Sequence, residues 1–155
     1  MISLILAGKV GSSIASEIGS MRVSEQIDAL EIMGVNSASF LILPKIIASL
    51  FFFPLLVILS MGIGMIGAWV GGLSVNVTTS DFMYGLRYEF IPFFVSYAII
   101  KTLAFAFIVS SLSSYFGYYA KGGAVAVGKS STEAVVYSSI VILVFNFILT
   151  KIILA

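Results

Sequence analysis

One stretch of the chain matches a nucleotide-binding pattern letter for letter. Gly123-Ala-Val-Ala-Val-Gly128-Lys129-Ser130 fits the formula G-x-x-x-x-G-K-S, in which a glycine loop wraps phosphates and the lysine binds them. A working loop of this kind follows a buried β-strand, and its domain supplies a downstream Asp that holds magnesium. Here apolar stretches precede and follow the pattern, and no Asp occurs after Asp81. We therefore predict a flexible turn between two apolar helices, not a nucleotide site.

A second stretch imitates a dinucleotide-binding fingerprint. Gly62-x-Gly64-x-x-Gly67 has the right spacing, but it lies inside a long apolar run with no strand before it. Gly67 and Gly71 also form a G-x-x-x-G pair, which lets membrane helices approach closely. These glycines predict helix packing.

Acidic residues give the most distinctive polar pattern, in the connection 20–43. Ser24 is a suitable N-cap for a helix from Glu25 to Met33, and Gly34 suits the position after its end. At 100° per residue, Glu25, Asp28 and Glu31 share one side of this helix. Most of the remaining circumference is apolar, formed by Ile27, Ala29, Leu30 and Met33.

Such a short amphipathic helix has two interpretations. It could lie on the lipid headgroups, although helices of that kind usually carry Lys or Arg on the polar side. It could instead dock into a basic groove of a protein partner. The residues alone leave both open.

Composition sets the class of protein. Hydrophobic residues make up 60% of the 155, charged residues 10%, and the mean hydropathy is +1.16. A soluble domain carries about 25% charged residues. The net charge of +1 gives no basic surface for nucleic acid. The sequence predicts an all-α integral membrane protein.

The residue types also limit the chemistry. The sequence contains no Cys and no His. Disulfides, thiol catalysis, Cys/His zinc sites and histidine general bases are therefore excluded. We expect no cofactor, no metal and no enzymatic activity of its own.

Three apolar blocks are long enough to cross a bilayer, which takes about 20 residues. They cover 44–70, 91–116 and 134–154. Pro44 and Pro92 lie near the starts of the first two, where a missing N–H costs little, and Pro54 predicts a kink. The segment 1–19 is short and charged, so we expect a partial membrane helix whose upstream half is missing.

Charge in the connections predicts the orientation. The connections 20–45 and 117–132 carry more Lys and Arg than 71–90 does. Positive loops face the cytoplasm. The segment 24–34 is therefore expected on the cytoplasmic side and the C-terminus on the other.

Three charges within the apolar segments are candidates for a functional or structural role. Lys101 lies inside the 91–116 block and either lines a lipid path or pairs within the bundle. Lys9 and Glu17 carry the same two alternatives, but they are too far apart along a helix to bond each other. Glu17 is expected to pair with Arg22.

The stretch Glu17-Ile-Gly-Ser-Met-Arg-Val-Ser-Glu-Gln-Ile-Asp-Ala-Leu-Glu-Ile-Met-Gly34 resembles the motif of the MlaE-type permease family. The segments 7–11 and 116–128 also match that family's pattern. Two positions depart from it, since Val125 and Asn146 stand where family members often have an acid. The resemblance covers the whole chain as a single transmembrane domain, 1–155.

The resemblance implies a function and partners. Family members are membrane subunits of ABC transporters that move phospholipid across the envelope of bacteria, in the inner membrane. Two permease copies would pair with cytoplasmic ATPase subunits, with an MCE-type lipid-binding protein on the outer face. The ATPase-coupling helix would comprise Glu25, Gln26, Asp28, Ala29, Leu30 and Glu31, ending at Gly34. A membrane scaffold that transports nothing is the alternative.

Overall fold

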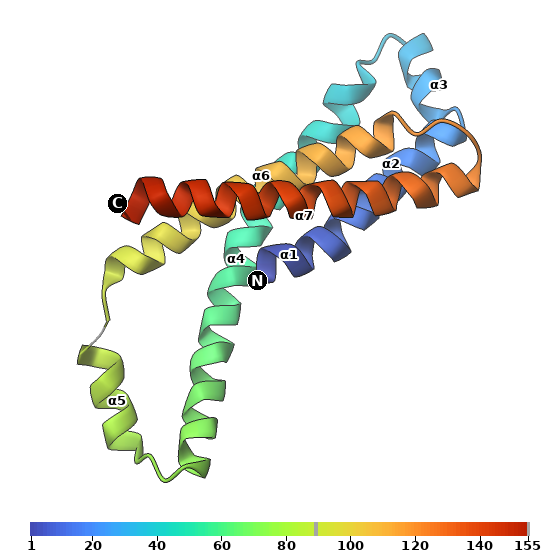
Figure 1. Cartoon of the computed structure of the whole chain (residues 1–155). Helices are drawn as coiled ribbons and strands as arrows, with labels where there is room; N and C mark the ends of the chain where they lie inside the picture. The colour runs from blue at the N-terminus through green and yellow to red at the C-terminus, as the bar shows by residue number, and fades with distance from the viewer. Residues whose placement is uncertain (89, 155) are drawn as a thin grey trace.

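The computed structural model describes residues 1–88 and 90–154, and all of their regular structure is helical. Four helical stretches in this part are long and apolar enough to cross a membrane. The predicted class, an all-α membrane protein, is confirmed (Figure 1).

The first stretch runs through three consecutive elements, α1 (Ile2–Leu6), the π-helical turn η1 (Ala7–Gly11) and α2 (Ser12–Val23). Its 22 residues make it one of the four candidate spans. The helix therefore continues four residues beyond the 1–19 boundary that we expected. A π turn places one extra residue in a helix and often marks a functional position.

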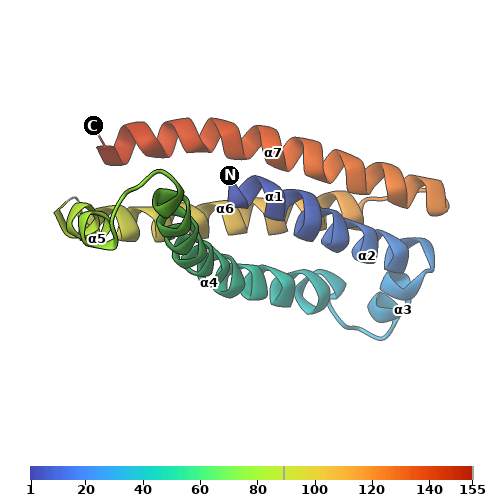
Figure 2. The same cartoon turned by 90° about the horizontal axis from the view of Figure 1, so that it is seen from below.

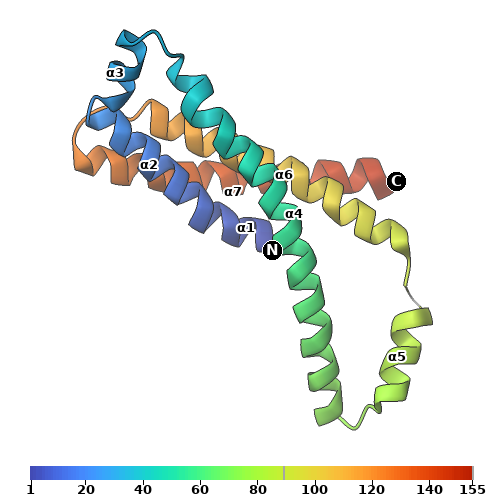
Figure 3. The same ribbon diagram turned by 180° about the vertical axis from the view of Figure 1, so that it is seen from behind.

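Helix α4 (Ser37–Ser74) begins earlier than predicted. The Asn36 side chain accepts a hydrogen bond from the backbone N–H of Ser39 at 3.1 Å, which caps the helix. The predicted start at 44 is therefore wrong, because this cap lies outside the apolar block, and Pro44 is inside the helix. Figure 3 shows α4 changing direction in its middle part. Pro54 lies in this part and has no backbone N–H to donate to the helix, which is a common cause of a kink.

Helices α6 (Pro92–Tyr118) and α7 (Ala124–Leu154) form the rest of the bundle. Pro92 occupies the first turn of α6, as expected. Helix α7 begins ten residues before the predicted 134, so the flexible turn expected at 123–130 is wrong. The carbonyl of Gly123 accepts the backbone N–H groups of Ala126 and Val127, which starts the helix there. The true turn is short and contains Gly122 at a φ of +121°.

Helix α6 is the centre of the bundle and packs against α2, α4 and α7 (Figure 2). The main apolar cluster joins η1, α4, α6 and α7 through Ala7, Phe53, Phe105, Ala106, Val109 and Ile142. Helices α2 and α6 approach so closely that a Cβ on Gly117 would lie 2.7 Å from the carbonyl oxygen of Ala15. Small residues permit this contact, as in many membrane helix pairs.

The second half of α4 leaves the bundle together with α5 (Thr79–Tyr88), as Figure 1 shows. The connection 71–90 therefore contains a helix that the sequence pattern did not predict. Trp69 donates its indole N–H to Thr79 at 3.4 Å across the hairpin. A Cβ added to Gly62, Gly64, Gly67 or Gly71 would meet no atom of the described residues within 4 Å. The expected packing of these glycines is therefore not formed within the described part of the chain.

Candidate functional site

The predicted coupling segment forms α3 (Gln26–Ile32), a helix that follows α2 after a turn of two residues. The Ser24 side chain donates back to the carbonyl of Ser20 at 2.9 Å, so Ser24 ends α2 and does not cap α3. Glu25 adopts a φ of 60°, a left-handed conformation that is uncommon outside glycine. The prediction of a Ser24 cap was wrong because the Ser24 hydroxyl bonds to a carbonyl in the last turn of α2 instead.

The end of α3 follows the prediction. Gly34 adopts a φ of +77° and donates its N–H to the carbonyl of Glu31 at 3.0 Å. The N–H of Val35 donates to the carbonyl of Leu30 at 3.1 Å. Together these bonds form a Schellman motif, in which a glycine satisfies the last carbonyls and turns the chain.

Ile27 anchors α3 to the bundle. Its side chain is fully buried and packs with Ile14 and Ile18 of α2. Tyr118, from the end of α6, also packs against this cluster. Burying an isoleucine side chain contributes about 1.5–3 kcal/mol. The apolar side of α3 therefore faces its own chain at this position.

Two of the three acids of the coupling segment also turn toward the bundle. Asp28 accepts a hydrogen bond from the Arg22 guanidinium at 2.7 Å. The same guanidinium lies 5.6 Å from the centre of the Tyr118 ring. Arg22 thus connects the end of α2 with α3 and α6.

Glu31 makes the corresponding connection to α4 and α6. Its carboxylate accepts hydrogen bonds from Ser37 and from Tyr118, both at 2.9 Å. The bond from Ser37, and then that from Tyr118, hold the pKa of the Glu31 carboxyl below its ordinary value. Glu31 therefore stays charged and ties three helices together.

We call these contacts the α3 joint, and they involve Arg22, Ile27, Asp28, Glu31, Ser37 and Tyr118. The joint leaves a different surface exposed from the one that the sequence suggested. Glu25, Gln26 and Ala29 are exposed, and so are Ile32 and Met33 at 87% and 68%. The exposed surface of α3 is thus partly apolar, and two of its acids, Asp28 and Glu31, also bind side chains of the bundle.

Glu17 has a different partner from the expected one. Lys45 of α4 donates to its carboxylate at 2.6 Å, and Arg22 binds Asp28 instead. Positions 17 and 22 differ by about 140° around a helix, so their side chains point to different sides. The pair joins α2 to α4.

Lys101 lies between α6 and α7. Its ammonium donates to the hydroxyl of Tyr97 at 2.7 Å and to that of Thr150 at 2.8 Å. This arrangement supports the alternative of a bond within the bundle. Lys9 is exposed in η1, and no ion pair involves it in the part that the structure describes.

Two of the apolar hollows along α4 lie against helices of the bundle. The larger, about 550 Å³, is between α4 and α6, around Leu50, Pro54, Ile58, Ile99 and Leu103. The other, about 300 Å³, is between α4 and the N-terminal helix, and its lining includes Val10 and Phe52. Both open to the surface and could accommodate hydrocarbon chains.

Sequence reasoning missed Ser37, Lys45 and Tyr118. Each binds an acid of another element, Tyr118 at a separation of 87 residues. The only signal was weak: Tyr118 lies at the end of an apolar block, where tyrosines are common for interfacial reasons alone.

The amino-acid sequence of the whole bundle is similar to that of a known protein family. The chain matches the family described as permease MlaE over residues 1–152. The chain belongs to the MlaE permease family. The resemblance inferred from the 17–34 motif is therefore confirmed.

Individual members of this family give the extent of the match. The chain is 40% identical over 152 residues to a "probable ABC transporter permease protein" of Rickettsia bellii, covering 97% of this chain and 59% of that protein. It is 36% identical over 154 residues to "Protein TRIGALACTOSYLDIACYLGLYCEROL 1, chloroplastic" of Arabidopsis thaliana, covering 96% of this chain and 43% of that protein. A Synechocystis protein, "probable ABC transporter permease protein slr1045", is 34% identical over 151 residues, covering 97% of this chain and 57% of that protein. The chain thus spans less than two thirds of these MlaE-family relatives.

Proposed function

We propose that this chain forms part of the membrane subunit of an ABC transporter that moves phospholipid, with α3 as the element that receives force from an ATPase. The observation that carries the proposal is the α3 joint. A short helix outside the spans is bonded to α2, α4 and α6 while its outer side stays exposed.

The joint suggests how a push on α3 would reach the spans. Ser37 is the first residue of α4, and Tyr118 is the last of α6. Because Glu31 binds both hydroxyls, a displacement of α3 would move these two helix ends together. The larger apolar hollow lies between the same two helices, so its width would change with them.

Lipid as the cargo is supported by two further facts. The larger hollow is lined by hydrocarbon side chains alone, and the smaller one by six apolar residues with Lys45 and Ser49. The Arabidopsis relative is named after a galactosylated diacylglycerol. The Rickettsia relative is described as a probable ABC transporter permease. Our proposal includes a second permease copy, an MCE-type protein on the outer face and the bacterial inner membrane as location.

The test uses the exposed side of α3. Ala29→Arg places a bulky charge there without touching the α3 joint, and we expect it to abolish co-purification of the transporter's ATPase subunit. Gly85→Arg is the matched control, since Gly85 is exposed on α5 and has open space around it. ATPase binding by the Ala29→Arg variant equal to that of the control would contradict the docking assignment.

A non-transporting scaffold is the competing function. It would bind the same partners but would not move lipid. Transfer of a fluorescent phospholipid between vesicles, dependent on ATP and on the reconstituted subunits, separates the two.

A further inference from the structure

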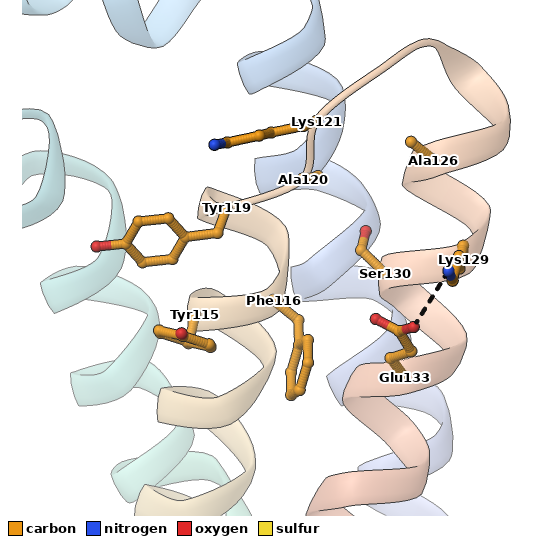
Figure 4. A pocket seen from close by; sticks show the side chains of 9 residues that line it. All are labelled: Tyr115, Phe116, Tyr119, Ala120, Lys121, Ala126, Lys129, Ser130 and Glu133. Carbon is orange, nitrogen blue, oxygen red and sulfur yellow. Dashed lines mark ion pairs between the residues drawn. The ribbon is translucent and has the colours of Figure 1, made fainter.

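The beginning of α7 holds a pocket that the proposed function does not use. It lies between the end of α6 and the first turns of α7, with a volume of about 310 Å³ (Figure 4). Tyr115, Phe116 and Tyr119 come from the α6 side, and Lys129, Ser130 and Glu133 from α7. Ala120, Lys121 and Ala126 complete the lining.

The pocket is lined by both charged and aromatic side chains. The ammonium groups of Lys121 and Lys129 and one carboxylate, Glu133, give the lining a net charge of +1. The bridge between Lys129 and Glu133 is long, 3.8 Å, and leaves the Lys129 side chain 77% exposed. Phe116 is stacked on Tyr137 with ring centres 5.1 Å apart, which makes a firm apolar wall. Lys121 follows the end of α6 and Lys129 lies on α7 (Figure 4), and two cations with an aromatic wall suit an amphiphile with a phosphate.

The nucleotide interpretation of the same residues fails on geometry. In a phosphate-binding glycine loop, backbone N–H groups point at the phosphates. Here the N–H groups of Ala126 and Val127 bond to the carbonyl of Gly123, at 2.9 and 3.4 Å. The Ser130 hydroxyl donates to the carbonyl of Val127. The lysine side chains remain to bind an anion.

The position of the pocket indicates which anion is available. Helix α6, a candidate span, ends at Tyr118, and three tyrosines cluster there: Tyr115, Tyr118 and Tyr119. Tyrosines at the end of a span are typical of the level of the lipid headgroups. Lysines at this level are attracted to lipid phosphates.

We propose that this pocket binds the phosphate-bearing headgroup of a glycerophospholipid, held by Lys121 and Lys129 with its glycerol region against Phe116. This lipid is a resident ligand at the α3 end of the bundle. The inference requires only that the chain is embedded in a membrane, and not that it transports lipid.

The experiment measures lipid binding to the purified, delipidated protein in a neutral detergent. Dioctanoyl phosphatidylglycerol and dioctanoyl phosphatidylethanolamine are titrated, and binding is followed by thermal stability and by native mass spectrometry. We expect both to bind and dioctanoyl glycerol, which lacks the phosphate, to bind at least tenfold more weakly. Equal binding of dioctanoyl glycerol would overturn the phosphate assignment.

Two variants test the residues. Lys121→Gln with Lys129→Gln should weaken phosphatidylglycerol binding about tenfold or more, since two charges near a headgroup are lost. The matched control is Lys9→Gln with Lys151→Gln, which removes two exposed charges elsewhere and should leave binding unchanged. An equal loss in the control would overturn the site and indicate general attraction of lipid to lysines.

A third variant separates a pocket from a charged surface. Ala126→Phe fills the pocket without changing any charge, and we expect it to reduce binding as much as the lysine changes do. Unaltered binding in this variant would overturn the pocket. Inorganic phosphate alone distinguishes the source of the anion: stabilisation equal to that by phosphatidylglycerol would overturn the lipid assignment.

Discussion

The bundle at the α3 end and the hairpin of late α4 with α5 share apolar residues and glycines but differ in packing. Both are apolar and rich in glycine. At the α3 end, a Cβ on Gly117 would meet the backbone of Ala15, and Ile27 is fully buried. In the hairpin, Gly64 has open space around it and Ile63 is 70% exposed.

The difference teaches that an apolar helix is held in place only where side chains and backbone of other helices contact it. The α3 end combines close helix contacts with polar bonds from Arg22, Glu31 and Tyr118. Such an end can transmit displacement, because bonded and packed elements move together. The described residues of the hairpin contribute one side-chain bond between α4 and α5, from Trp69.

The largest expected effect concerns the two isoleucines. Ile27→Ala should lower the free energy of unfolding by about 2–5 kcal/mol, because it leaves a cavity between α3 and α2. Ile63→Ala removes the same atoms from an exposed position and should change the free energy of unfolding by less than about 0.5 kcal/mol. Denaturant titration in detergent measures both. Equal losses would break the distinction between the two regions.

The glycines should show a smaller contrast. Gly117→Ala places a methyl group 2.7 Å from the Ala15 carbonyl oxygen, and overpacking of this kind costs about 1–3 kcal/mol. Gly64→Ala meets no atom within 4 Å and should be neutral or slightly stabilising. Thermal unfolding of the two variants side by side tests this. A destabilised Gly64→Ala protein would indicate a contact of α4 outside the described chain.

Acid should loosen α3 selectively. The pKa of Glu31 is lowered below its ordinary value of 4.5, chiefly by the bond from Ser37. A lowered folded-state pKa means that the carboxylate stabilises the joint fully above the ordinary pKa and loses this effect as the pH falls through the lowered one. Hydrogen exchange of the α3 amides, corrected for intrinsic rates, should accelerate only in that acidic range. Glu31→Gln should remove this pH dependence, whereas α5 should exchange alike in both proteins.

The smallest expected effect is the ion pair between Glu17 and Lys45. Partly exposed pairs contribute about 0.2–1 kcal/mol. A double-mutant cycle with Glu17→Gln and Lys45→Met should give a coupling of this size, and Glu17→Gln with Arg22→Met should give none. Coupling of Glu17 to Arg22 instead would contradict the pairing seen in the structure.

The sequence by itself determined what depends on local chain chemistry. Apolar length predicted the three later spans, since a bilayer fixes the length of a helix. Pro92 predicted the start of α6, and Gly34 predicted the end of α3, because each residue has a strong conformational preference. The 17–34 motif was specific enough to indicate the family.

Tertiary structure alone decided the partners of the charges. Glu31 binds Tyr118 and Glu17 binds Lys45, and no local rule relates residues so far apart. For the same reason, the sequence did not indicate that Asp28 and Glu31 bind side chains of the bundle. Side-chain periodicity gives which residues share a side of a helix, but only the packing of the other helices decides where that side points.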